Sequence, residues 1–267
     1  MKPTLGVALG AGSARGLAHL GALKAFEEEG IEIDYLGGTS MGSVIGGFYA
    51  AGLSLNRLER LAIHLKWEHL TDITVPRKGL IAGNKVKEFF ELLTHRKNFE
   101  DLNLPFVAVA ADIEKGEEVV IKEGLVADGI RASMSIPGVY VPYELDGRVL
   151  VDGAVLNRVP VTPVREMGAD IVVGVEVSYN VINGTKVNNI FDVIINSIDI
   201  MQQEIAEHKN TGADILIIPE VGHIPTTGLD QAEECIKLGY QATKESIPKI
   251  KKLIEEWSLD EASQQRR

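Results

Sequence analysis

The sequence has very little cysteine: Cys235 is the single one among 267 residues. One cysteine excludes a disulfide within the chain and a zinc site built from several thiolates. Cys235 lies in the apolar pattern of a late helix, which predicts a buried thiol with a structural role. We therefore expect no function based on cysteine chemistry.

Positive charge and long apolar runs are also scarce. The formal net charge is −11, whereas a generic nucleic-acid binder needs a basic surface, so we expect no nucleic-acid partner. No apolar run approaches the roughly 20 residues that a membrane-spanning helix needs. Residues 1–4 lead straight into a strand-like run, without the charged and apolar regions of a signal peptide. These absences predict a cytoplasmic protein whose membrane contact is at most peripheral.

The remaining composition, 45% hydrophobic and 24% charged, is that of a globular domain. Strand-like segments occur at residues 4–9, just before Ser40, and at 105–112, 117–122, 148–151, 171–177 and 215–218. Helical patterns occur at 17–29, 43–51, 54–65, 125–134, 160–167, 190–210 and 228–257, the last interrupted near Pro248. This alternation predicts an α/β fold of three layers, α/β/α, with a mostly parallel central sheet. We expect one domain over 1–257 and a frayed polar tail over 258–267.

Residues 34–46 read as a short strand, a G-x-S-x-G pentapeptide centred on Ser40, and an apolar helix. That order is typical of a nucleophile elbow. The turn is so tight that a Cβ at Gly38 or Gly42 would collide with the crossing backbone. Ser40 would then stand strained and exposed at the tip, beside the N-terminus of the following helix. An ordinary glycine-rich turn is the alternative interpretation.

A second glycine loop, Gly10–Gly16, joins the first strand to the first helix and predicts an anion site made of backbone N–H groups. It lacks the Gly-Lys-Ser/Thr of a phosphate-binding loop. A dinucleotide-binding fold requires an acidic residue at the end of the next strand, and this sequence has none there. The remaining use of the loop is an oxyanion hole that faces Ser40.

A serine hydroxyl needs a neighbouring base. Among the histidines, His223 is the fair candidate because it lies in a loop, whereas His208 lies within a long helix and His19 is explained by packing. Asp152 is the stronger candidate, because it ends a strand and we expect that end at the same sheet edge as the elbow. An Asx turn that caps the strand is the alternative role for Asp152.

These motifs, together with Arg131-Ala132-Ser133 and Ile136-Pro137, resemble in order and spacing the patatin-like phospholipases, serine hydrolases with a Ser–Asp dyad. The resemblance implies Ser40 as nucleophile, Asp152 as base, amides near Gly12 and Ser13 as the oxyanion hole, and no metal or organic cofactor. The matching motif residues are Gly10, Arg15, Gly16, Gly38, Gly42 and Gly153.

The glycine loop departs from the family pattern. Ala11 and Ser13 interrupt a run that often reads G-G-G, which leaves open which amides point inward. Arg15 is a cation near a helix N-terminus, an unfavourable place. We expect a carboxylate partner for it, with an anionic substrate as the alternative.

Residues 57–97 are locally basic, with nine Lys or Arg against five acids, and they include Trp67, Phe89 and Phe90. They form either a helical cap with a solvated face or a lid, over 57–100, that meets anionic head groups. The resemblance implies an acyl hydrolase acting on carboxylic esters of phospholipids or lysophospholipids. The alternatives are an α/β-hydrolase with a Ser40–Asp–His223 triad and a non-catalytic scaffold that binds acyl chains or a partner.

Overall fold

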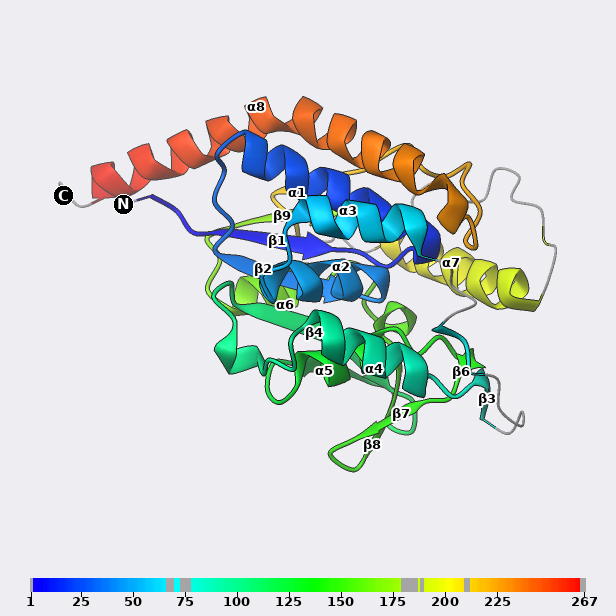
Figure 1. The fold of residues 1–267 in the computed structure, drawn as a ribbon. Coiled ribbons are helices and arrows are strands. Elements are labelled where there is room, and N and C mark those ends of the chain that lie inside the picture. The colour runs from blue at the N-terminus through cyan, green and yellow to red at the C-terminus, as the bar shows by residue number, and fades with distance from the viewer. Residues whose placement is uncertain are drawn as a thin grey trace.

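The computed structural model describes residues 2–65, 70–72, 78–178, 187, 190–208 and 212–264. An eight-stranded sheet in the order β10-β9-β1-β2-β4-β8-β7, with β5 paired to β4, forms its centre. Helices cover both faces of this sheet (Figure 1). The predicted three-layer α/β/α fold with a mostly parallel sheet is confirmed.

Five strands form the parallel part of the sheet: β10 (Ile215–Ile217), β9 (Ile171–Val175), β1 (Leu5–Leu9), β2 (Tyr35–Thr39) and β4 (Phe106–Asp112). β1, β4 and β9 are buried along their whole length. Continuous apolar runs are what a sheet covered on both faces requires. The carboxyl ends of β1 and β2 meet at one edge, since Leu9 pairs with Gly38.

The far side of the sheet is antiparallel. β5 (Glu117–Ile121) and β8 (Arg148–Asp152) both run against β4, and β7 (Tyr143–Leu145) runs against β8. β8 therefore runs opposite to β2, the strand that leads into Ser40. Asp152 ends this antiparallel strand, whereas the rule on which its expected place beside the elbow rests describes parallel strands.

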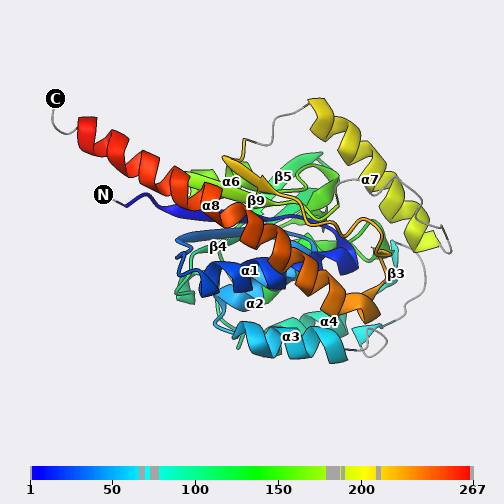
Figure 2. The same ribbon diagram turned by 90° about the horizontal axis from the view of Figure 1, so that it is seen from above.

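The main core lies on one face, where odd-numbered β1 residues such as Val7 contact the main helical layer. The helices of this layer are α1 (Ala18–Glu28), α2 (Met41–Ala50), α3 (Leu55–His64), α4 (Asn84–Leu93), α5 (Val126–Ser133) and α8 (Ala232–Gln264). On the other face α6 (Val161–Glu166) packs a smaller cluster around Ala8 and Val172. α7 (Ile190–His208) lies at one end of the molecule (Figures 1 and 2). No helix in the described ranges has the length and apolar character needed to cross a bilayer.

α8 is one helix through Pro248, so the predicted interruption there is wrong. Proline removes a backbone donor and clashes with the preceding turn, at a cost of about 3 kcal/mol. Ile247 and Ile250, on either side of it, are buried in the main core, and α8 packs along α1 (Figure 2). α8 also continues to Gln264, into the segment predicted as a frayed tail, and residues 265–267 lie outside the described part.

The basic stretch contains α3, α4 and the short strand β3 (Gly79–Ile81), which pairs with β6 (Gly138–Tyr140). Lys66, Trp67 and Arg77 lie outside the described residues.

Candidate active site

Ser40 occupies the turn between β2 and α2, as the elbow pattern predicts. Its backbone is strained, with φ 55° and ψ −123°, a region that residues with a Cβ rarely adopt. A Cβ on Gly38 would collide with the Gly42 carbonyl, and a Cβ on Gly42 with the Leu9 carbonyl. Only glycine therefore permits the close crossing of backbones that raises Ser40 at the tip.

The strain at Ser40 predicts a difference between two inactive variants. Ser40→Gly relieves the unfavourable φ, whereas Ser40→Ala keeps it, and both remove the hydroxyl. We expect Ser40→Gly to have the higher free energy of unfolding, by about 1 kcal/mol, since the strain of about 1–3 kcal/mol exceeds the entropic cost of glycine. Urea denaturation measures the difference. Equal stability of the two variants would contradict the strained elbow.

Asp152 accepts a hydrogen bond from the Ser40 hydroxyl through Oδ2, with 2.6 Å between the oxygens. Its other oxygen, Oδ1, accepts from the Ala154 amide at 2.9 Å. The Asx cap and the contact with the serine are therefore both present, one on each oxygen. The amide fixes the rotation of the carboxyl group and keeps Oδ2 on the serine.

Asp152 is 4% exposed, and burial raises the pKa of its carboxyl to about 6. Hydrogen bonds from Ser40 and Ala154 favour the ionised form and oppose this rise. Near neutral pH the carboxylate is charged, yet it is a better proton acceptor than an ordinary aspartate.

The topology explains how an antiparallel strand brings Asp152 to the elbow. β8 pairs with the last residues of β4, so that Asp152 lies opposite Ala110. β4 is also the neighbour of β2, with Val109 opposite Thr39. The β4–β8 pairing therefore begins where the β2–β4 pairing ends. Since only β4 lies between β2 and β8, the side chains of Ser40 and Asp152 can meet across its end.

Ser133, at the end of α5, binds the backbone of Ser40. Its Oγ accepts from the Ser40 amide at 2.9 Å and donates to the Val109 carbonyl at 2.6 Å. From the sequence, Ser133 is noticed only as part of a block that resembles the family. The nearby Arg131 is buried and donates to the carbonyls of Ala82 and Gly83, which joins α5 to the start of α4.

The glycine loop lies next to Ser40. Ser13, in the left-handed region with φ 50°, lines the same pocket as Ser40. Within the described part of the chain, the amides of Gly12, Ser13 and Met41 have no hydrogen-bond acceptor. The glycine loop and the N-terminus of α2 thus present free backbone N–H groups beside Ser40, as an oxyanion hole requires.

The remaining motif glycines sit at close contacts. A Cβ on Gly10 would press on the Val175 carbonyl, one on Gly16 on Met41, and one on Gly153 on the Val109 carbonyl. They allow the loop, the elbow and the end of β8 to approach one another.

Two buried side chains support the loop. The His19 imidazole lies 2.7 Å from the Gly10 carbonyl through Nε2, and burial lowers its pKa to about 4, so it is neutral and structural. Arg15 is fully buried, donates to the Ile224 carbonyl, and places Nη1 3.6 Å from Asp199 of α7. The predicted carboxylate partner of Arg15 is therefore Asp199, which also pairs with Arg158.

His223 lies away from this arrangement. Its Nε2 is 3.0 Å from Glu234 Oε1 on the surface, and the side chain is 57% exposed. The Ser40 hydroxyl is instead hydrogen-bonded to Asp152. The geometry therefore favours the Ser–Asp pair over the alternative triad. Cys235 is buried against the Ala14 carbonyl, as predicted for a structural thiol.

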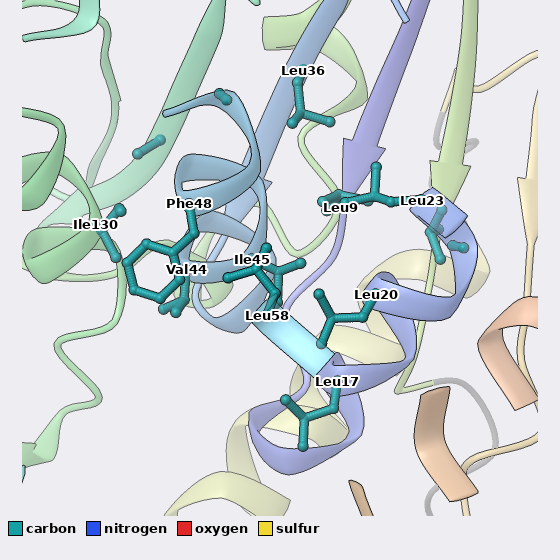
Figure 3. Close-up of a cluster of buried hydrophobic side chains, with 14 of the residues drawn as sticks. Leu9, Leu17, Leu20, Leu23, Leu36, Val44, Ile45, Phe48, Leu58 and Ile130 are labelled. Carbon is teal, nitrogen blue, oxygen red and sulfur yellow. The ribbon is translucent and has the colours of Figure 1, made fainter. Parts of the chain in front are cut away.

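An apolar pocket of about 340 Å³ opens beside Ser40. α2 contributes Val44, Ile45 and Phe48, and α3 contributes Leu58, Leu61 and Ala62. Figure 3 shows Leu17, Val44, Ile45, Phe48 and Leu58 gathered together. No charged side chain among the described residues lines it. The volume and lining suit an apolar ligand group.

Comparisons with known proteins find relatives over about two thirds of this chain. An uncharacterized NTE family protein of Mycobacterium tuberculosis is 36% identical over 179 residues, which cover 66% of this chain and 49% of that protein. Patatin-like phospholipase domain-containing protein 6 of Homo sapiens is 36% identical over 184 residues, 65% of this chain and 13% of that one. Lysophospholipase NTE1 of Saccharomyces cerevisiae is 34% identical over 179 residues, which cover 65% of this chain and 11% of that protein.

The chain thus spans about half the length of its mycobacterial relatives. Among solved structures, VipD from Legionella pneumophila superposes with a TM-score of 0.63 at 14% identity, over 91% of this chain and 66% of that one, which supports the fold alone. The profile of the patatin-like phospholipase family matches residues 7–165, more than half of the chain. The chain therefore belongs to the patatin-like phospholipase family.

Proposed function

We propose that this chain is a serine acyl hydrolase that cleaves carboxylic esters of lipids through Ser40 and Asp152. The observation that carries the proposal is the 2.6 Å hydrogen bond from the Ser40 hydroxyl to Asp152, beside an apolar pocket. Family membership and the relative named a lysophospholipase support the same reaction class.

In the first half of the reaction, Ser40 Oγ attacks the ester carbonyl carbon while its proton passes to Asp152 Oδ2. The oxyanion that forms is stabilised by amides of Gly12, Ser13 and Met41. The bond from carbon to the alcohol oxygen then breaks, and Asp152 returns the proton to the departing alcohol. The product is an acyl ester of Ser40.

In the second half, a water molecule attacks the acyl carbon and gives its proton to Asp152. The bond to Ser40 Oγ breaks, and the proton moves back to the serine. One ester and one water become one acid and one alcohol. Since the same carboxylate serves both halves, the proposal needs no histidine.

The acyl chain is the part of the substrate that suits the pocket, because the lining is apolar. A polar or charged head group stays outside, where water solvates it. We therefore propose phospholipids or lysophospholipids as the substrate class. A panel of lipid and short-chain esters with purified protein tests this, with Ser40→Ala as the blank.

A pocket variant tests the role of the lining. Ala62→Phe adds bulk to a partly exposed position on α3 that faces the pocket, without touching Ser40. We expect hydrolysis of long-chain esters to fall about tenfold while a two-carbon acyl ester is cleaved at a near-normal rate. Asn56→Phe, on the exposed side of the same helix, is the matched control. Equal losses for short and long chains would refute the acyl pocket.

We also propose that the basic stretch assists a peripheral contact with anionic lipid, in a cytoplasmic setting. Several of its cations already have partners: Lys87 pairs with Asp128, Arg96 with Glu91, and Lys97 Nζ donates to the Ala51 carbonyl. Lys85 is exposed, as are Arg57 and Arg60. These three cations would supply the attraction, which added salt should weaken.

A scaffold without turnover is the rival from another class. It would keep the pocket and bind acyl chains, but Ser40 would not react. Labelling by a fluorophosphonate, which modifies activated serines, separates it from an enzyme.

A further inference from the structure

Helix α7 contacts two separate parts of the active site through one carboxylate. Asp199 is buried, and it pairs with Arg15 through Oδ2 and with Arg158 through Oδ1. Arg15 belongs to the glycine loop, and Arg158 follows the strand end that carries Asp152. Asp199 therefore lies between two cations that come from different segments of the catalytic machinery.

Both arginines are tied to the glycine loop by backbone hydrogen bonds. The Arg15 amide donates to the Gly12 carbonyl at 3.0 Å, which closes the turn that contains Ser13. The Arg158 carbonyl accepts from the Ala11 amide, also at 3.0 Å. The positions of the two arginines therefore affect where the free amides of Gly12 and Ser13 point.

Gln202 gives α7 a contact with the segment that presents the base. Its side-chain amide donates to the Val155 carbonyl at 2.7 Å, in the turn directly after Asp152. Because Asp199 and Gln202 are three residues apart, they lie on the same side of the helix. Helix α7 thus connects the turn after the base to the loop that presents the amides.

The two cations depend on Asp199 for compensation of their charge. Within the described part of the chain, Nη1 and Nη2 of Arg15 have no hydrogen-bond acceptor, and Nη1 lies 3.6 Å from Asp199. Burial lowers the pKa of Arg15, the charge of Asp199 raises it, and the charge of Arg158 lowers it. The other carboxyl groups near Asp199 are those of Glu176 and Asp152, both buried. Without Asp199 the two buried guanidinium groups would repel each other.

We propose that Asp199 is a positioning residue that holds the glycine loop and the turn after Asp152 in the alignment that the reaction needs. The inference rests on the proposed function, because it concerns the same amides and the same base. Asp199 acts through Arg15 and Arg158, and not by contact with the reacting atoms. Its carboxylate neutralises both cations, which lets the two segments approach each other.

The first test compares a single with a double variant. Asp199→Asn keeps the shape of the side chain and removes its charge. We expect kcat for a soluble short ester to fall about 10- to 100-fold, because repulsion between Arg15 and Arg158 displaces the glycine loop. The double variant Arg158→Met/Asp199→Asn also removes the repulsion, so it should recover most of that loss. If Asp199 only filled space, the double variant would be slower than the single one.

The pH profile separates an effect of charge from a loss of packing. Burial raises the pKa of Asp152, the charge of Arg158 lowers it, and the charge of Asp199 raises it. The acidic limb of kcat/KM should therefore move to lower pH in Asp199→Asn and to higher pH in Arg158→Met. Loosened packing would expose Asp152 and move the limb to lower pH in both variants.

Two further variants serve as controls. Asp192→Asn removes another buried acid of α7, which accepts from the Thr226 hydroxyl at 3.2 Å. It should leave the acidic limb at the wild-type position. Asp199→Glu keeps the charge in a longer side chain, so the limb should also stay in place, whatever kcat becomes.

Circular dichroism verifies that each variant folds. If Asp199→Asn does not fold, Arg158→Met decides, because there Asp199 keeps its pairing with Arg15. The inference is overturned if the acidic limb in Arg158→Met stays in place or moves to lower pH, or if the double variant is slower than Asp199→Asn. These outcomes require an active wild type. A wild type without turnover that depends on Ser40 would instead refute the proposed function, and the inference with it.

Discussion

Replacing Asp152 by Asn should lower ester hydrolysis by about 10³–10⁴-fold, nearly as much as removing the serine hydroxyl in Ser40→Ala. Asn has almost the same shape, and its carbonyl oxygen still accepts from the Ala154 amide if it takes the place of Oδ1. It has no charged oxygen to receive the Ser40 proton at 2.6 Å. The loss therefore reports proton transfer and not packing.

The double variant Ser40→Ala/Asp152→Asn should lose little more than either single one. Two residues that act as one unit are strongly non-additive. Steady-state hydrolysis of a soluble ester, with circular dichroism to verify folding, measures all three variants. Near-normal turnover in Asp152→Asn would leave Asp152 as a strand-end cap, and the base would have to be sought elsewhere.

The same Asp152→Asn variant should be more stable than the wild type at alkaline pH. Burial raises the Asp152 pKa from 3.8 to about 6, so the folded state binds the proton more tightly than the unfolded state does. As pH rises through this window, ionisation of the buried carboxyl lowers the free energy of unfolding. The loss is about 3 kcal/mol when complete, at about 1.4 kcal/mol per pKa unit.

Urea denaturation of wild type and variant measures this effect between about pH 4 and pH 8. The stability difference should be small near pH 4, where both side chains are neutral, and should grow in favour of Asn up to about pH 7. A difference that does not change with pH would show that the Asp152 pKa is not raised. The acidic limb of the wild-type activity profile should fall near the same pKa of about 6 and stay there in His223→Ala.

The local parts of the site could be predicted from the sequence because local sterics determine them. The elbow at Ser40 needs its two glycines at fixed spacing, and that spacing is visible in the chain. The parallel strands could be predicted from their unbroken apolar runs. Pro248 misled the prediction of α8, because packing against α1 keeps the helix continuous.

Contacts that depend on tertiary arrangement could not be predicted. The expected place of Asp152 rests on a rule for the ends of parallel strands, yet Asp152 reaches Ser40 from an antiparallel strand. Ser133 is 93 residues from Ser40, and no local pattern marks it as the acceptor for that amide. Asp199 looks like one polar residue in an apolar helix, and its role becomes visible only when Arg15 is found buried beside it.

In the proposed reaction, Asp152 activates Ser40 without a histidine. The most direct measurement is the rate at which a fluorophosphonate labels the protein, with the modified residue located by peptide mass spectrometry. We expect an adduct on Ser40 that forms at the same rate in wild type and His223→Ala, far more slowly in Asp152→Asn, and not at all in Ser40→Ala. An adduct that forms equally fast in Asp152→Asn, or that disappears in His223→Ala, would contradict it.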